Sequence, residues 1–373
     1  MTSFGSDRHL RQNPKSGFAL LFAFVSLWLC TVPAAAGDAW YPLPVDVWDP
    51  PFNTERERTE AEYRPLDRAE EKWRICFLIP HLKDAYWLAA NFAVVDEARR
   101  LDVAFAIYSA GGYEHLDRQR RQFEECMAQS PDGILLSAVS VDGLNELVAA
   151  AVADGVPVVD LINGVSAPEI SARVGADFWD MGKAAGDYLA DLADRTDAPV
   201  RVAWLPGPAG AGWVESSDAG FRHAIADSPI EILETLNGDT GRAAQVALIE
   251  RALDLHPGRV DFIVGTAVTA EAAVAALHER DPSRRVGVMA DYYSPGVHRA
   301  IRRGQVIAAP SDLPALQTRI ALDTLVRIIE GREHFPHVAA RVVVIDRERL
   351  ATWDESASLP PRGFRPVLSL GWR

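Results

Sequence analysis

The chain has 373 residues, and its 52 acidic against 38 basic side chains give a formal net charge of -14 at pH 7. So acidic a chain lacks the positive surface with which proteins bind phosphate backbones, which excludes nucleic acid as a partner. Its length exceeds what one hydrophobic core usually holds, so we expect two lobes behind an N-terminal leader.

The N-terminus has the pattern of a secretory signal peptide over residues 1–36. Three basic residues, the last of them Lys15, precede an apolar run at 18–29, and a run of alanines ends at Ala36. This apolar run is too short for a transmembrane helix, and no later stretch is long enough to span a membrane. We predict cleavage after Ala36, export, and no membrane insertion of the mature protein. An uncleaved signal anchor is the alternative.

The segment 37–72 differs from the rest of the chain in its composition. It holds five prolines and the charge-laced run 55–60. A prolyl, mixed-charge stretch seldom forms its own core. We therefore expect an extended N-terminal arm over the first lobe or a flexible leader. Four aromatic residues favour docking or a partner contact over complete disorder: Trp40, Tyr41, Trp48 and Phe52.

From Trp73 onward, short apolar runs alternate with amphipathic stretches, which is the pattern of parallel α/β sheets. In the first set we expect strands at 75–79, 103–108, 133–136 and 156–161, with helices near 86–100, 116–128 and 141–153. In the second set we expect strands at 172–174, 200–205, 230–236, 261–264 and 285–289, with a helix near 179–194. A helix at 313–331 then returns the chain to the first lobe.

The predicted fold is therefore α/β, with two Rossmann-like lobes joined by a multi-strand hinge. The first lobe takes residues 73–165 plus 312–336, and the second takes residues 166–311 plus 337–373. Several crossings of the chain between two lobes make a hinge.

Two strands end in the same way, and the loops that follow them are the first indication of a site. An apolar run stops at Pro80, and another stops at Pro206; in each case a tryptophan follows seven residues later, at Trp87 and Trp213. Loops beyond the carboxyl ends of parallel strands bind ligands in open α/β sheets. If the two lobes face one another, these loops line a shared cleft, and we expect the ring of Trp87 to face it.

Motifs of catalysis and cofactor binding are missing. The chain has no phosphate-binding loop, no dinucleotide-binding glycine spacing and no nucleophile elbow. His334 and His337 lie around a proline with no acidic or cysteine partner nearby, which is a poor metal arrangement. We expect no cofactor, no metal and no enzymatic activity; an exported enzyme is the least favoured alternative.

What the sequence offers instead is aromatic residues at strand ends, lobe crossings and turns: Tyr86, Trp87, Tyr113, Phe178, Trp179, Trp213, Tyr292 and Tyr293. Each one taken singly is more often core packing than ligand contact. Aromatic faces attract methylated ammonium groups, and Asp84 and Asp291 add negative potential at the same mouth. A sugar is the open alternative, because sugar sites also combine stacking rings with polar side chains.

Several motifs resemble the TorT family of periplasmic trimethylamine N-oxide (TMAO) sensor proteins, which are type I periplasmic binding proteins. The most specific are Lys83-Asp84-x-Tyr86-Trp87 and Gly363-Phe364-Arg365-Pro366-Val367, and the stretches 110–113, 206–208 and 265–267 also match. The resemblance covers nearly all of residues 73–367. It implies a periplasmic protein that binds TMAO in its cleft and associates with the sensor domain of a membrane histidine kinase, TorS, in two-component signal transduction.

The resemblance assigns ligand contacts most strongly to Asp84, Tyr86, Trp87, Tyr113 and Tyr292. The chain departs from the family at Phe178-Trp179, where the family has a Trp-Phe pair. It also departs at Trp213, which replaces a glycine, and at Asp291, which replaces an aromatic residue. These departures bear on the identity of the ligand more than on the family.

A mechanism follows from the chemistry of TMAO, which carries positive methyl groups and a negative oxygen. We predict that a cage of rings holds the methyl groups: Tyr86, Trp87, Tyr113, Phe178, Trp179 and Tyr292. Asp84 gives electrostatic support, while tyrosine hydroxyls, indole N–H groups and Lys83 donate hydrogen bonds to the oxygen. Closure of the lobes then alters the surface that a sensor domain reads. The alternative is a receptor that delivers a sugar or autoinducer to a membrane permease, such as an ABC transporter.

The mature chain keeps only two cysteines, Cys76 and Cys126. An oxidising compartment permits them to pair, and two buried free thiols are the alternative. The TorT family resemblance includes both positions. We predict a disulfide.

Overall fold

The structure, a computed structural model, describes residues 43–372 apart from 53–57, 197, 281–282 and 284. The predicted signal peptide over 1–36, its cleavage after Ala36, and the arm residues Trp40 and Tyr41 lie outside the described residues. Within the described ranges, no helix combines the length and the apolar character needed to cross a bilayer.

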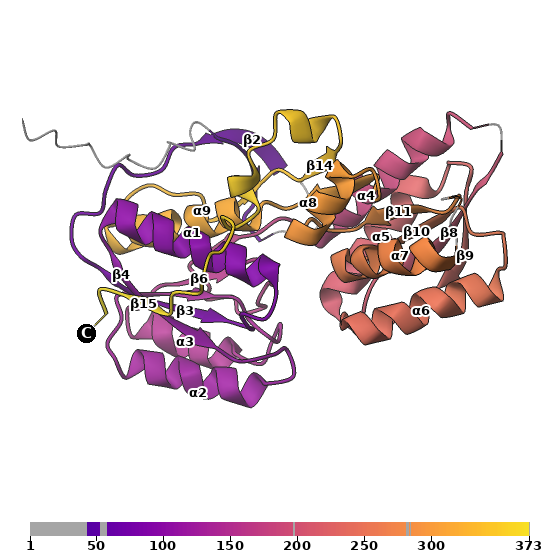
Figure 1. Cartoon of the computed structure of the whole chain (residues 1–373). Coiled ribbons are helices and arrows are strands. Elements are labelled where there is room, and N and C mark those ends of the chain that lie inside the picture. The colour runs from indigo at the N-terminus through magenta and orange to yellow at the C-terminus, as the bar shows by residue number, and fades with distance from the viewer. Residues whose placement is uncertain (1–42, 53–57, 197, 281–282, 284, 373) are drawn as a thin grey trace, which may run out of the picture. The chain divides into compact units, whose positions relative to one another are not determined.

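The first sheet has nine strands among the described residues, in the order β15-β4-β3-β5-β6-β7-β13-β1-β2. Figure 1 labels β15, β4, β3, β6 and β2 among them. The parallel strands of this sheet are β3 (Arg74–Ile79), β4 (Ala104–Ser109), β5 (Gly133–Leu136), β6 (Val158–Leu161), β7 (Ala172–Val174) and β13 (His337–Ala340). Antiparallel strands complete both edges: β15 (Ser369–Leu370) beside β4, and β1 (Leu43–Trp48) with β2 (Arg58–Tyr63) beside β13.

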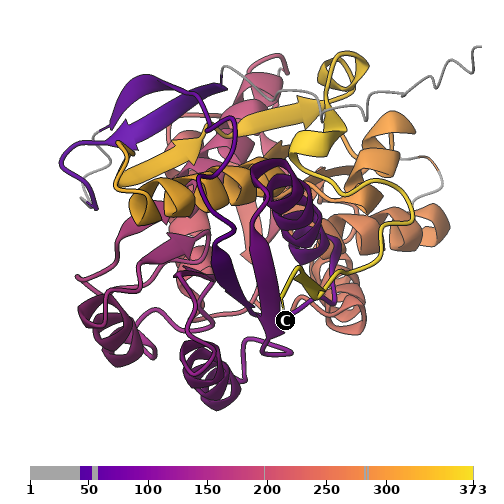
Figure 2. The same cartoon turned by 90° about the vertical axis from the view of Figure 1, so that its left-hand side faces the viewer.

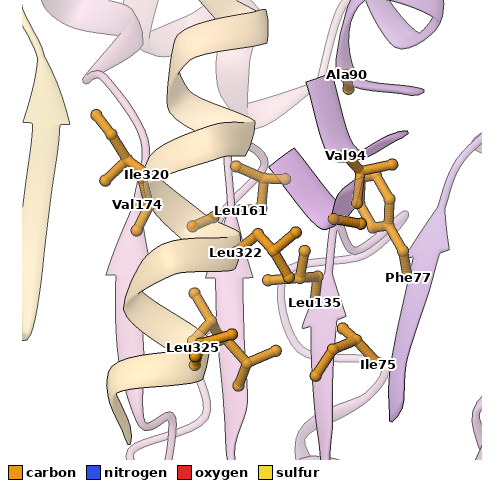
Figure 3. Close-up of a cluster of buried hydrophobic side chains, with 14 of the residues drawn as sticks. Ile75, Phe77, Ala90, Val94, Leu135, Leu161, Val174, Ile320, Leu322 and Leu325 are labelled. Carbon is orange, nitrogen blue, oxygen red and sulfur yellow. The ribbon is translucent and has the colours of Figure 1, made fainter. Parts of the chain in front are cut away.

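Helices α1 (Ala85–Leu101) and α9 (Pro314–Ile329) cover one face of this sheet. Phe77, Leu135 and Leu161 project from neighbouring strands toward Val94 of α1 and Leu322 of α9 (Figure 3). All five side chains are fully buried or nearly so. Alternate strand residues point the other way, so the sheet is covered on both faces, as parallel sheets require.

Helices α2 (Leu116–Met127) and α3 (Asn145–Ala153) cover the opposite face. A disulfide joins Cys76 of β3 to Cys126 of α2, and both cysteines are fully buried. The sequence left open a disulfide or two buried free thiols, and the structure contains the disulfide. It fastens α2 to β3, an interior strand of the first sheet.

The second sheet has four parallel strands in the order β11-β10-β8-β9: β8 (Val200–Leu205), β9 (Ile230–Thr235), β10 (Phe262–Gly265) and β11 (Gly287–Ala290). Helices α4 (Phe178–Ala193) and α5 (Gly212–Ile225) pack on one face, where Trp204 points. Helices α6 (Arg242–Leu255), α7 (Ala267–Arg280) and α8 (Pro295–Arg302) pack on the other, where Leu205 points. This alternation is the period of two that a strand imposes. The predicted two-lobed α/β fold is confirmed.

The chain crosses between the two sheets more than once. It leaves the first sheet after β7, and it returns where β12 (Ala308–Ser311) leads into α9. It leaves again after β13 to form β14 (Val343–Asp346), which pairs antiparallel with β12. The short helices η1 (Arg349–Ala351) and η2 (Glu355–Ala357) precede the return to β15. Leu313, between β12 and α9, adopts a left-handed backbone conformation with φ of 59°, which marks a sharp turn.

Three strands lie in a different sheet from the one that the sequence predicted. We assigned 166–311 and 337–373 to the second lobe, but β7, β13 and β15 all belong to the first sheet. The reason is burial: Val174 of β7 and Val338 of β13 pack into the core beneath α9. Of the C-terminal segment, β14 and residues that follow it lie on the second side, where Ile345 and Leu359 join the core of the second sheet.

The N-terminal arm forms more structure than its composition predicted. Strands β1 and β2 make a hairpin whose first strand pairs with β13, with Val45 opposite Ala340 (Figure 2). The Tyr63 hydroxyl donates to Asp323 of α9 at 2.7 Å, and Val45 and Tyr63 are buried in the first core. Pro44 lies just before the part of β1 that pairs with β13, so its missing N–H breaks no bond there. The arm is an extension of the first sheet.

Candidate ligand-binding cavity

A cavity of about 1740 Å³ is lined by the loops that follow the parallel strands of both sheets. From the first sheet come residues after β3, β4, β5 and β6, and from the second come residues after β8, β9, β10 and β11. The carboxyl ends of parallel strands are where open α/β sheets bind their ligands. The cavity is therefore the candidate site.

Most of the residues that we predicted from the sequence lie on the wall of this cavity: Asp84, Tyr86, Tyr113, Phe178, Trp213 and Tyr292. The rings of Phe178 and Trp213 lie 6.3 Å apart, centroid to centroid, and come from α4 and α5. Tyr86 comes from the first turn of α1, which follows β3, and Tyr113 comes from the loop after β4, so rings from both sheets face one cavity.

The prediction that Trp87 faces the cavity is wrong. Its side chain is 2% exposed and packs in the first core. The physical reason is the start of α1: Asp84 caps the helix by accepting a hydrogen bond from the backbone N–H of Trp87 at 3.1 Å. This cap places Trp87 in the first helical turn, on the face that packs inward. Tyr86, one residue earlier, takes the cavity position.

Trp179 and Asp291 are likewise absent from the cavity wall. Asp177 caps α4, and adjacent helical residues point about 100° apart, so Phe178 faces the cavity while Trp179 packs 5.2 Å from the ring of His223 on α5. Asp291 directly follows β11 and is buried beside the cavity-lining Tyr292. Its Oδ1 has no hydrogen-bond partner among the described residues, and burial raises the pKa of Asp291 to about 8.

Tyr86 is fixed by a chain of buried hydrogen bonds. Its hydroxyl donates to Oδ2 of Asp312 at 2.5 Å. Gln317 of α9 donates to the same carboxylate oxygen at 2.9 Å and accepts from the backbone N–H of Ala176 at 2.7 Å. Asp312 and Ala176 stand in two different crossings between the sheets. A cavity-lining ring is therefore tied to both crossings.

Tyr113 forms another part of the wall, and the residue remains 44% exposed. Desolvation raises the pKa of Tyr113 to about 12, against the lowering effect of hydrogen bonds to Asn163 and Trp87. Trp87 thus supports a cavity-lining ring from behind, although it does not line the cavity itself.

The charge around the cavity is mixed, with acidic residues in excess. The acidic side chains on its wall are Asp84, Glu114, Asp177, Asp239 and Glu271, and the basic ones are Lys83, Arg173 and Arg299. Arg173 is already paired with the buried carboxylate of Asp160 at 2.7 Å. Such a wall suits a neutral or cationic ligand better than a phosphate. No group of three or more potential metal-binding side chains occurs in the part of the chain that the structure describes.

One section of the wall, which the N-terminal arm supplies, was not predicted from the sequence. Trp48 and Phe52 line the cavity together with His337, whose ring stacks on Trp48 at 4.0 Å. His337 Nδ1 accepts a hydrogen bond from the backbone N–H of Phe52, and burial lowers the pKa of His337 to about 3, so the ring is neutral. The aromatic residues of the arm were the available signal, but their distance from the other loops in sequence hid their place in the site.

Comparison with known proteins gives a consistent picture. The family model described as the periplasmic binding protein domain matches residues 75–333. The periplasmic protein TorT of Escherichia coli (strain K12) is 35% identical over 302 residues, which are 80% of this chain and 85% of that protein.

Two solved structures are also similar. An ABC transporter solute binding protein from Bradyrhizobium sp. BTAi1, with bound Bis-Tris, is 42% identical with a TM-score of 0.83, covering 88% of this chain and 98% of that one. The complex of the TorS sensor domain with TorT in the presence of TMAO contains a chain that is 29% identical with a TM-score of 0.74, covering 79% of this chain and 99% of that one.

Proposed function

Since this chain belongs to the periplasmic binding protein family and is related to TorT, we propose that it is a periplasmic sensor whose cavity binds TMAO or a related methylated amine. Its relatives are binding and sensor proteins, and we propose that it too works by binding a ligand and not by catalysis.

The observation that carries the proposal is the aromatic wall of the cavity. Tyr86, Tyr113, Phe178, Trp213 and Tyr292 present rings from both sheets, and Asp84 adds a negative charge beside them. Ring faces and a nearby carboxylate favour the positive methyl groups of a methylated nitrogen, and such contacts are worth about 2 kcal/mol when desolvated.

The N-oxide oxygen needs hydrogen-bond donors, and the structure reduces the number of residues that can supply them. The Tyr86 hydroxyl already donates its proton to Asp312, so this residue offers only its ring. Lys83, Trp213 and Tyr292 line the cavity and carry donor groups. We assign donation to these three.

The signalling partner follows from the same relatives. The TorS sensor domain forms a complex with TorT, in the absence of ligand and in the presence of TMAO. We propose that the present chain associates with the periplasmic sensor domain of a TorS-like histidine kinase, and that ligand binding changes the surface which this domain contacts.

Titration calorimetry tests the ligand. We expect TMAO to bind, tetramethylammonium to bind more weakly because it lacks the oxygen, and ribose to give no heat. Ribose binding more tightly than TMAO would overturn the proposed ligand. Size-exclusion chromatography with the periplasmic domain of a TorS-like kinase tests the partner, and we expect the two proteins to elute together.

A second candidate function is a solute-binding receptor for an ABC transporter. The observation that favours it is the Bradyrhizobium protein, which is 42% identical and carries that description. Bis-Tris, its bound molecule, is a tertiary amine with hydroxyl groups, so an amine that carries hydroxyls fits both candidates. Titration calorimetry against a panel of sugars and hydroxylated amines tests this candidate. Binding of one of these compounds, together with failure to bind any kinase sensor domain, would favour the receptor.

A further inference from the structure

Arg58, at the start of β2 in the N-terminal hairpin, reaches out of the first sheet to a helix of the second. Its guanidinium makes a two-pronged ion pair with Asp180 of α4, in which Nη2 lies 2.7 Å from Oδ1 and Nη1 contacts Oδ2. Both side chains are about one fifth exposed, at 20% and 18%. Bidentate pairs of this kind are the most specific of the charge-assisted hydrogen bonds.

The hairpin end of this pair is rigidly held. The Arg58 guanidinium lies 5.0 Å from the ring centroid of Trp48, which in turn stacks on His337 of β13. The hairpin itself is part of the nine-stranded sheet, and Tyr63 at its far end is bonded to Asp323 of α9. Arg58 therefore acts from a fixed platform on the first sheet.

The other end of the pair is the first turn of α4, which shapes the cavity. Asp180 follows Phe178 by two residues, and the ring of Phe178 lines the cavity opposite Trp213. The rest of α4 packs on the second sheet through Ala185 and Leu189. The pair thus links the two sheets beside the crossing at 175–177.

We propose that Arg58 is a positioning residue for the ligand cavity: through Asp180 it holds the first turn of α4, and hence the ring of Phe178, in place against the cavity. Arg58 itself is not on the cavity wall. The proposal rests on the proposed function where it concerns ligand affinity. The N-terminal arm, for which the sequence left open an extended arm over the first lobe or a flexible leader, is on this view a working part of the binding site.

Three variants test the proposal by affinity. Arg58→Gln and Asp180→Asn each remove the pair while keeping a polar side chain, and we expect each to weaken TMAO binding roughly two- to fivefold, the range that a solvent-accessible ion pair gives. The double variant should be no weaker than the single ones, because all three lose the same pair. Wild-type affinity in Arg58→Gln, or additive losses in the double variant, would overturn the proposal.

Arg341→Gln is the matched control. Arg341 pairs with Asp46 at 2.9 Å and with Glu60 at 2.7 Å, so its loss removes ion pairs of the same hairpin without reaching α4. We expect this variant to keep wild-type affinity and a thermal midpoint close to that of Arg58→Gln. An equal loss of affinity in Arg341→Gln would mean that hairpin stability in general is responsible, and the positioning role would fall.

Hydrogen exchange without ligand separates this proposal from the proposed function. We expect the backbone amides of residues 178–182 to exchange faster in Arg58→Gln than in Arg341→Gln. If the wild-type protein failed to bind TMAO, the ligand assignment would be wrong, yet this exchange comparison would still decide the role of Arg58. Equal exchange in the two variants would refute it.

Discussion

At the residue scale, two capping carboxylates decide which aromatic side chains reach the ligand cavity. Asp84 and Asp177 each accept a hydrogen bond from the backbone N–H of a tryptophan in the first turn of the helix that follows. The two tryptophans, Trp87 and Trp179, then pack on neighbouring helical or core residues, and the aromatic residue before each lines the cavity. The sequence indicated the aromatic pairs. Which residue of each pair reaches the cavity depends on the residue at which the helix begins, and sequence patterns place that residue only to within one or two positions.

Alanine at Trp87 and at Phe178 should therefore have opposite effects. Trp87 is 2% exposed, so Trp87→Ala should cost about 3 to 5 kcal/mol of unfolding free energy. Phe178 lines the cavity, so Phe178→Ala should weaken TMAO binding roughly tenfold and change stability little. Urea unfolding and titration calorimetry on both variants measure the two quantities. Trp87→Ala with native stability and lost affinity would restore the cavity role for Trp87.

Asp291 predicts a pH dependence of stability. Burial raises its pKa to about 8 in the folded protein, against an unfolded value near 4, so the folded state binds the extra proton between these values. This carboxyl should therefore lower stability as pH rises from about 4 to 8, by up to about 1.4 kcal/mol per pH unit. Asp291→Asn removes the titration, and urea unfolding should show the variant gaining on the wild type between pH 5 and pH 9. Parallel pH profiles would contradict the prediction.

At the element scale, the N-terminal arm and the disulfide show what composition can and cannot predict. Five prolines and a run of alternating charges gave no sign of the hairpin, because β2 lies at the sheet edge and keeps charged side chains in solvent. The disulfide needed only two cysteines and an oxidising compartment. Most of the parallel strands and their helices were predictable from alternation alone, whereas β13 was not predicted as a strand. Strands as short as β7 and β13 were not assignable to a sheet, because a few apolar residues fit either core.

Removing the disulfide should destabilise the protein without altering the ligand cavity. The bridge spans 50 residues of sequence between β3 and α2, and bridges of this kind contribute about 2 to 4 kcal/mol by restricting the unfolded chain. The double variant Cys76→Ala/Cys126→Ala should lose that amount in urea unfolding and keep its affinity for TMAO. As a check on the bridge itself, thiol titration of the unreduced wild type in denaturant should find no free thiol; two titratable thiols would disprove it.

At the scale of the whole molecule, the site exists because several crossings bring two sheets to one cavity. The sequence predicted two lobes, a shared cleft and most of its aromatic wall, since loops after parallel strands are recognisable. It could not predict the contacts that join distant segments, such as Trp48 with His337 or Tyr86 with Asp312, because only the folded topology brings them together. These contacts connect the wall of the ligand cavity to the chain crossings between the two sheets. Any movement of one sheet relative to the other must change the conformation of these crossings.

Gln317 tests that connection. It joins Asp312, the partner of Tyr86, to the backbone of Ala176, so Gln317→Leu cuts the link between two crossings and leaves buried polar groups unpaired. We expect a loss of about 1 to 3 kcal/mol in unfolding free energy.

Gln119→Leu is the matched control, because Gln119 is equally buried and bonds the backbone of Ser137 and Val139 within the first sheet region. The two variants should lose similar stability. Only Gln317→Leu should reduce the change in radius of gyration that TMAO produces in small-angle scattering, since only there is the ligand wall uncoupled from the crossings. An unchanged response in Gln317→Leu, or an equal reduction in Gln119→Leu, would show that this chain of hydrogen bonds does not transmit ligand binding.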